Sequence, residues 1–131
     1  MPWLSFAAVG AGAAVGAWIR WGLGLLLNPV FPTIPFGTLS ANLLGGWLMG
    51  VAMAVLAHFD AVAPELRLLI TTGFLGGLTT FSTFSAETTT LFTRGQYGWT
   101  AAIIALHVAG SIAMTLAGIF VAHLVLGGKS P

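Results

Sequence analysis

Residues Gly73–Ser85, with the sequence GFLGGLTTFSTFS, interrupt a long apolar segment with an unusual set of side chains. These thirteen positions hold three glycines, five hydroxyl residues and three phenylalanines. Gly76 and Gly77 can adopt backbone angles that end a helix, and Thr79 or Thr80 can cap a helix that resumes after them. The stretch therefore predicts a broken helix. A continuous helix whose hydroxyls bond back to its own carbonyls is the alternative.

The composition around this stretch indicates an integral membrane protein. Of the 131 residues, 57% are hydrophobic and 5% are charged, and the mean hydropathy is +0.99. Soluble domains carry about 25% charged residues, so too little polar surface is present to keep this chain dispersed in water. The N-terminus lacks the basic region of a cleavable signal peptide. With no cysteine and no basic cluster, the chain offers neither thiolate metal ligands nor a nucleic-acid surface.

Four apolar segments are long enough to cross a bilayer, which takes about 20 helical residues. The predicted spans cover residues 3–27, 36–58, 64–94 and 99–126. The connections between them are too short for an extramembrane domain. We therefore predict an all-α membrane protein in which residues 1–131 form a single four-helix transmembrane domain, with the third helix broken near its middle.

The basic residues give no preferred orientation in the membrane. With the N-terminus inside, Arg67 and Lys129 lie on the cytoplasmic side and Arg20 and Arg94 lie outside. Lysines and arginines normally concentrate on the cytoplasmic side, so this balance predicts a chain that inserts both ways up. Such a chain can form an antiparallel homodimer, which recreates between subunits the inverted symmetry of many transporters.

A helix break at membrane depth survives only where it is buried in protein or faces a polar cavity. Here it would free the carbonyl groups of residues 76–79 to hold a small cation. The first N–H groups of the restarted helix would face an anion. The stretch is therefore the predicted functional centre.

Phe81 and Phe84 are three residues apart and share a helix face. Aromatic rings have a positive edge, so two edges along one path would favour a small anion. Interleaving with Ser82, Thr83 and Ser85 supports this interpretation, and simple packing of the two rings is the alternative.

Polar residues in the second and fourth spans add to this centre. Asn42 lies four residues after Thr38 on one face. Its amide either bonds across helices or donates an N–H to an anion. Ser111 and Thr115 form a second hydroxyl row, which alone is equally consistent with helix contacts.

Arg20 and Glu87 are charged residues that lie well inside predicted spans, away from the span ends. Arg20 and Glu87 either pair with each other or lie apart, with Arg20 reaching the interface and Glu87 exposed. The three histidines lie on different segments without metal-ligand spacing, so we expect packing or helix-end roles for His58, His107 and His123.

Glycines four residues apart predict close helix contacts. Gly12 with Gly16, and Gly46 with Gly50, are expected to pack in this way. The pair Gly73 and Gly77 lies at the edge of the predicted break, and we assign it to the break instead.

These motifs together resemble one family, the CrcB/Fluc fluoride channels. The resemblance rests on residues 12–20 (GAAVGAWIR), residues 37–45 (GTLSANLLG) and the opening stretch, and extends over essentially the whole chain. It implies a passive, fluoride-selective channel in the cytoplasmic (inner) membrane of a bacterium, which lets fluoride escape and reduces its toxicity. It also implies an antiparallel, dual-topology homodimer with two pores.

The resemblance further implies roles for individual residues. Phe81 and Phe84 would be the pore aromatics, with Asn42 as their amide partner. Carbonyls of Gly76 and Thr79 from both subunits would hold a structural sodium ion. The remaining positions would form an aqueous vestibule (Arg20, Thr38 and Glu87) and a polar track (Ser82, Thr83, Ser111 and Thr115).

Two other functions remain as alternatives. A small four-helix proton-coupled exporter would share size and dual topology, but the first span lacks the acidic residue that proton coupling uses. In a non-transporting assembly subunit, the Phe/Ser/Thr stretch would only pack. No hydrolase elbow, zinc-binding helix motif or phosphate loop is present, so we do not expect an enzyme.

Overall fold

A computed structural model describes residues 1–127, and all of its regular elements there are helices. Four helical segments are long and apolar enough to cross a membrane, as predicted: Pro2–Val30, Phe36–His58, Pro64–Thr93 and Tyr97–Leu126. The first combines α1 (Pro2–Leu27) with a 3-10 turn, η1 (Asn28–Val30). Lys129, which enters the charge count, lies outside the described residues.

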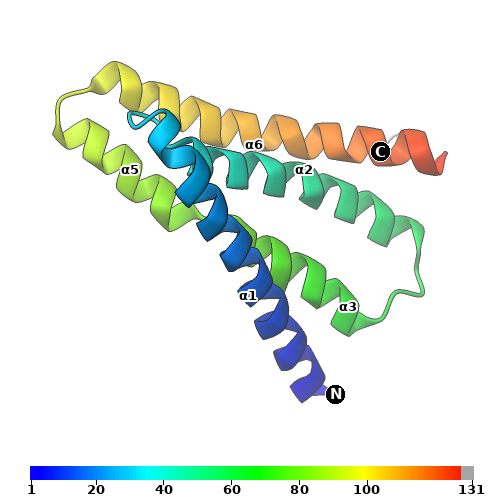
Figure 1. Cartoon of the computed structure of the whole chain (residues 1–131). Coiled ribbons are helices and arrows are strands. Elements are labelled where there is room, and N and C mark those ends of the chain that lie inside the picture. The colour runs from blue at the N-terminus through cyan, green and yellow to red at the C-terminus, as the bar shows by residue number, and fades with distance from the viewer. Residues whose placement is uncertain (128–131) are drawn as a thin grey trace.

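Helices α2 (Phe36–His58) and α6 (Tyr97–Leu126) run side by side and form the most extensive helix pair of the chain (Figure 1). Glycines make this close approach possible. A Cβ added at Gly50 would collide with the carbonyl oxygen of Thr115, and one added at Gly118 would collide with that of Trp47. The expected packing role of the glycine at position 50 is therefore confirmed, and its contact lies on α6.

Helix α1 packs mainly against the first half of the third span. Here the expectation for Gly73 and Gly77 is wrong, because both serve packing. A Cβ at Gly77 would meet the backbone of Ala13, and a Cβ at Gly16 would meet the backbone of Phe74 and Leu78. Two rows of small residues thus let the two backbones pack closely. Such close packing stabilises helix pairs in a bilayer, where no hydrophobic effect drives helices together.

The third span is broken, but not where its glycines suggested. It consists of α3 (Pro64–Leu68), a π-helical segment η2 (Leu69–Leu75), α4 (Gly76–Leu78) and α5 (Phe81–Thr93). Gly76 is helical, with φ −63° and ψ −36°, whereas Thr79 is extended, with φ −88° and ψ 157°. The break lies at Thr79 and Thr80, and Thr80 is the N-cap of α5.

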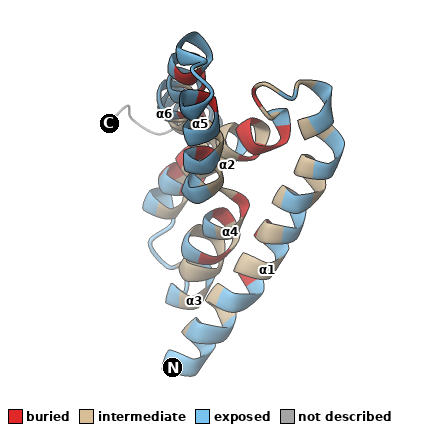
Figure 2. Cartoon of the chain, turned by 90° about the vertical axis from the view of Figure 1, so that its left-hand side faces the viewer, coloured by how far each residue is buried: buried red, intermediate tan, exposed pale blue. Residues whose placement is uncertain are grey.

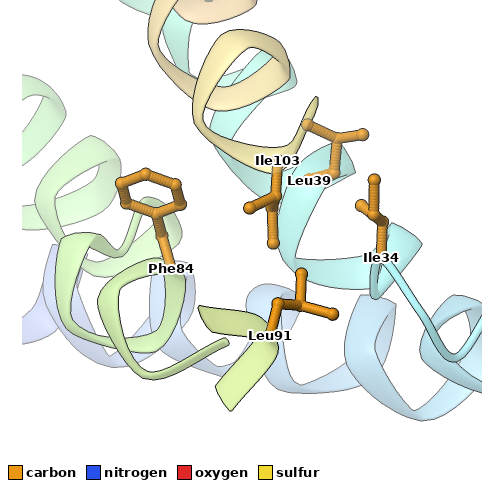
Figure 3. Packing of buried hydrophobic residues seen from close by; sticks show 5 residues of the cluster. All are labelled: Ile34, Leu39, Phe84, Leu91 and Ile103. Atoms are coloured by element: carbon orange, nitrogen blue, oxygen red, sulfur yellow. The ribbon is translucent and has the colours of Figure 1, made fainter. Parts of the chain in front are cut away.

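The core consists of two small apolar clusters, one where α2, α5 and α6 meet and one between α2 and the end of the η2–α4 segment. One apolar cluster joins Phe84 and Leu91 of α5 to Ile103 of α6, with Leu39 of α2 and Ile34 of the preceding loop (Figure 3). Outer helix faces are largely exposed, and on α1 only Gly12 and Gly16 are buried (Figure 2). This apolar outer surface suits lipid or a partner subunit.

Candidate functional site

Asn42 of α2 holds the backbone of Thr80 at the helix break. The Thr80 N–H donates to Asn42 Oδ1 at 2.7 Å, and Asn42 Nδ2 donates to the Thr80 carbonyl at 3.0 Å. A backbone N–H can only donate and a carbonyl can only accept, so these two bonds fix which way round the amide lies. The break is stable at Thr80 because Asn42 Oδ1 gives the Thr80 N–H the acceptor that it lost when the helix ended.

Thr80 also caps the helix that restarts. Its hydroxyl oxygen accepts the N–H of Thr83 at 3.2 Å and lies 3.1 Å from the Thr83 hydroxyl. The preceding N–H groups of the first turn belong to Phe81 and Ser82, which have no intrahelical acceptor. The N-terminus of α5 therefore points a positive helix end toward the break.

A pocket of about 280 Å³ lies beside this helix end. Its lining includes the predicted pore residues Asn42, Phe81 and Phe84. His107, for which the sequence predicts no pore role, lines it as well. Thr80 and Ser111 complete the polar part, and Val108 and Ile112 supply an apolar wall. The structure thus brings four predicted residues from three spans to one pocket: Asn42 of the second span, Phe81 and Phe84 of the third, and Ser111 of the fourth.

The two phenylalanines have different surroundings. Phe84 is 8% exposed and belongs to the core cluster, whereas Phe81 is 77% exposed. Their rings meet edge to face, with centroids 5.6 Å apart and an interplanar angle of 66°. Such an arrangement places the edge of one ring against the face of the other. Packing within the chain therefore accounts for Phe84 but not for Phe81.

Arg20 lies in a neighbouring pocket of about 280 Å³ with Thr38, Thr80 and Thr83. Arg20 Nε donates to the carbonyl of Gly77 at 3.0 Å, so the guanidinium lies at the C-terminal end of α4. A cation at a helix C-terminus is favourable, and this one also satisfies a carbonyl next to the break.

Glu87 does not pair with Arg20, since no salt bridge joins them in the described part of the chain. Glu87 lines a separate pocket of about 340 Å³ with Arg94 and Gln96. Its carboxylate lies beside Thr38, and its Oε2 is buried without a hydrogen-bond partner among residues 1–127. The predicted vestibule residues therefore gather at one end of the bundle but line two pockets.

The four residues of the predicted track are placed differently from one another. Ser82 is exposed, Thr83 faces the cap of α5, and Ser111 lines the pocket with the phenylalanines. The Thr115 hydroxyl lies 2.9 Å from the carbonyl of Gly46 and 3.0 Å from that of Ser111, and donates to them. Thr115 thus makes the contact between α2 and α6 that the alternative interpretation expected.

The two predicted cation ligands have carbonyls that the break leaves without their usual helix donors. In an unbroken helix the Gly76 carbonyl would accept the Thr80 N–H, which instead goes to Asn42. The Thr79 carbonyl would accept the Thr83 N–H, which instead goes to the Thr80 hydroxyl. Gly76 is also on the exposed surface of the chain, where a second subunit can approach.

His107 is the site residue that the sequence analysis missed. It is 4% exposed on α6, and its Nδ1 lies 3.0 Å from Asn42 Nδ2. By itself, a single histidine in an apolar span predicts a packing or helix-end role. Its spacing holds the missed signal, because His107, Ser111 and Thr115 are four residues apart in succession and so share one helix face.

The sequence is similar to known proteins over most of its length. Residues 7–119 match the family described as CrcB-like protein, Camphor Resistance (CrcB). A fluoride-specific ion channel FluC from Aromatoleum aromaticum is 65% identical over 114 residues, 87% of each chain. One from Nitrosospira multiformis is 62% identical over 112 residues, 86% of this chain and 88% of the relative. One from Pseudomonas paraeruginosa is 57% identical over 125 residues, 95% and 98% of the two chains.

Proposed function

This chain belongs to the CrcB family, and from that membership we propose that it is a passive, fluoride-selective channel. Its family and its four apolar helices make it a multi-pass bacterial membrane protein. The relatives named above are ion channels, a class of protein that transports and does not catalyse. In the cytoplasmic membrane, such a channel would let accumulated fluoride leave the cell and so reduce its toxicity.

One feature of the chain carries this function: the pocket where the restarted helix α5 meets α2 and α6. Fluoride holds its water tightly, so a pore has to replace that shell with several close donors. The first N–H groups of α5, the Ser111 hydroxyl and the positive edges of Phe81 and Phe84 are donors of this kind. Among residues 1–127, no lysine or arginine lines this pocket, so none of them puts a fixed positive charge there that would retain an entering anion.

An antiparallel homodimer with two pores would complete the path. Phe81 and Ser82 are exposed at the break, so a second subunit is needed to form the opposite wall. In such a dimer each pore would be lined by both chains. The balanced basic residues described above support insertion in both orientations.

A structural sodium ion would lie on the axis of that dimer. The carbonyl oxygens of Gly76 and Thr79 are hard neutral ligands of the type that alkali ions take from unwound membrane helices. Their helix donors are engaged elsewhere, so these oxygens fit a cation. The ion would hold the two breaks together and balance the partial negative charge of the carbonyls.

Fluoride efflux from liposomes tests the function. Liposomes loaded with potassium fluoride and this protein should release fluoride rapidly when valinomycin lets potassium leave, whereas chloride release should stay near that of protein-free liposomes. Equal chloride release, or fluoride release only with a proton gradient, would contradict the channel. Protein purified and reconstituted with N-methyl-D-glucamine instead of sodium salts should give slower efflux in this assay than protein prepared in sodium salts, and unchanged efflux would argue against the cation site.

Dual topology can be read from a single introduced cysteine, since the chain has none of its own. Gln96 lies exposed in the connection between α5 and α6. In Gln96→Cys, a membrane-impermeant maleimide should label about half of the chains in intact cells and all of them after permeabilisation. Labelling of all chains, or of none, before permeabilisation would show a single orientation and exclude the antiparallel dimer.

A further inference from the structure

Thr79 is held by two hydrogen bonds to one carbonyl at the end of α4. Its N–H donates to the Leu75 carbonyl at 3.0 Å, and its hydroxyl donates to the same oxygen at 2.8 Å. The backbone then leaves the helix, with ψ 157° at Thr79. Because the hydroxyl occupies one staggered position on Cβ, the direction of the Thr79 methyl group is fixed as well.

That methyl group fills a gap that a glycine leaves in α2. Gly45 is buried on α2, and a Cβ built on it would overlap Cγ2 of Thr79. The same Cβ would lie 3.6 Å from Cβ of Thr79 and 3.8 Å from Cδ2 of Leu78, which are ordinary contact distances. Of the described atoms, Thr79 Cγ2 is therefore the one that a larger residue at position 45 would displace.

Thr79 cannot make room for such a residue without losing a contact. Rotating its side chain to either other staggered position takes the hydroxyl away from the Leu75 carbonyl, because the substituents of Cβ keep their order. Otherwise the backbone of Thr79 has to move away from α2. The glycine and the hydroxyl bond therefore hold Thr79 from two sides.

The peptide group held in this way carries a predicted cation ligand. It joins the Thr79 carbonyl to the Thr80 N–H, which donates to Asn42 Oδ1 at 2.7 Å. A trans peptide places its C=O and N–H on opposite sides, so the Thr79 carbonyl points away from Asn42. All three contacts thus restrain the direction of this one oxygen.

We propose that Gly45 and the Thr79 hydroxyl are positioning groups for the cation site, which fix the direction of the Thr79 carbonyl. This inference rests on the sodium site of the proposed function and adds the residues of the same chain that give the site its shape. Binding groups have to be held within about 0.5 Å of their productive geometry by the packing and hydrogen bonds around them. Gly45 acts on the ion through Thr79 and does not touch it.

The gain in melting temperature from sodium measures this role without a flux assay, because an ion that binds only the folded protein stabilises it. Wild type prepared in sodium salts should melt about 5 °C or more above wild type prepared in N-methyl-D-glucamine salts. Gly45→Ala should lose most of this sodium-dependent difference. A packing defect alone would lower both melting temperatures and leave the difference unchanged.

Gly10→Ala is the matched control for Gly45→Ala. Gly10 lies inside α1, and a Cβ built on it meets no described atom within 4 Å. This variant should keep the full sodium-dependent difference.

Two changes at position 79 test the same contacts from the other side. Thr79→Ser keeps the hydroxyl and removes the methyl group that a Cβ at position 45 would overlap. The double variant Gly45→Ala, Thr79→Ser should therefore regain the sodium-dependent difference. Thr79→Val keeps a methyl group beside Gly45 but has no hydroxyl for Leu75, so it should lose much of the difference although α2 is unaltered.

Wild-type fluoride efflux, measured on the same preparations, separates this inference from the proposed function. If the wild type releases no fluoride, the channel function fails, and the melting temperatures alone decide the role of Gly45. If it conducts fluoride but melts alike in both salts, the cation site fails and the positioning role with it. If Gly45→Ala or Thr79→Val keeps the full difference, or if the double variant does not regain it, only the positioning role is overturned.

Discussion

Replacing Phe81 by isoleucine should lower fluoride efflux by at least about thirtyfold and leave the thermal stability of the protein almost unchanged. The ring is 77% exposed in the single chain and is absent from the apolar clusters, so its loss removes little packing. Isoleucine keeps a similar bulk but has no polarised edge. A cation over a ring face gains about 2 kcal/mol when desolvated, and an anion contact of the same strength at the ring edge corresponds to about thirtyfold in rate.

Phe120→Ile is the matched control for this substitution. Phe120 lies on α6, is 63% exposed and lines none of the pockets described above. Its replacement should change neither efflux nor the melting temperature. Efflux of Phe81→Ile at the wild-type rate would remove the ring edge from the mechanism. An equal loss in both variants would indicate a general effect of exposed phenylalanines on assembly.

The four helices are predictable because each is a long apolar run with a clear end. Pro35 precedes α2, Pro64 begins α3, and Gly95 has a positive φ of 74° where α5 ends. These are local signals, and local signals determine where helices begin and end. The π-helical segment Leu69–Leu75 has no such signal in the sequence, since it depends on the packing of α1 against it.

The position of the helix break could not be predicted from the glycines alone. A glycine permits unusual backbone angles, but it also permits close approach of a second helix. Gly77 is helical and serves close approach to Ala13. The break lies two residues further on because Asn42, 38 positions earlier in the chain, satisfies both backbone groups of Thr80. Only the tertiary structure brings these residues together.

The candidate site was predictable only in part from the sequence. Phe81 and Asn42 each stand out as unusual residues for their positions, and they do line one pocket. His107 does not stand out by itself, because a single histidine in an apolar helix usually packs. Its significance comes from the contact with Asn42, which lies 65 positions away in the sequence.

Replacing Asn42 by alanine should affect both stability and transport, in contrast to Phe81→Ile. The substitution leaves two polar groups without partners: the N–H of Thr80 and Nδ1 of His107. Each buried group left unsatisfied costs about 1 to 3 kcal/mol, so the variant should lose several kcal/mol of stability. The break at Thr80 is then no longer held, and fluoride efflux should fall to the protein-free level.

Tryptophan fluorescence during heating, followed by the efflux assay, separates the two ways in which Asn42 can act. Ser40→Ala is the control, since it removes a polar group from the same helix that makes no side-chain hydrogen bond in the described residues. It should melt like the wild type. If Asn42→Ala loses efflux but melts at the wild-type temperature, the amide meets the ion directly and Thr80 does not need it. If both fall together, Asn42 acts by holding the helix break, and donation to the anion is left to the Ser111 hydroxyl and the N-terminus of α5.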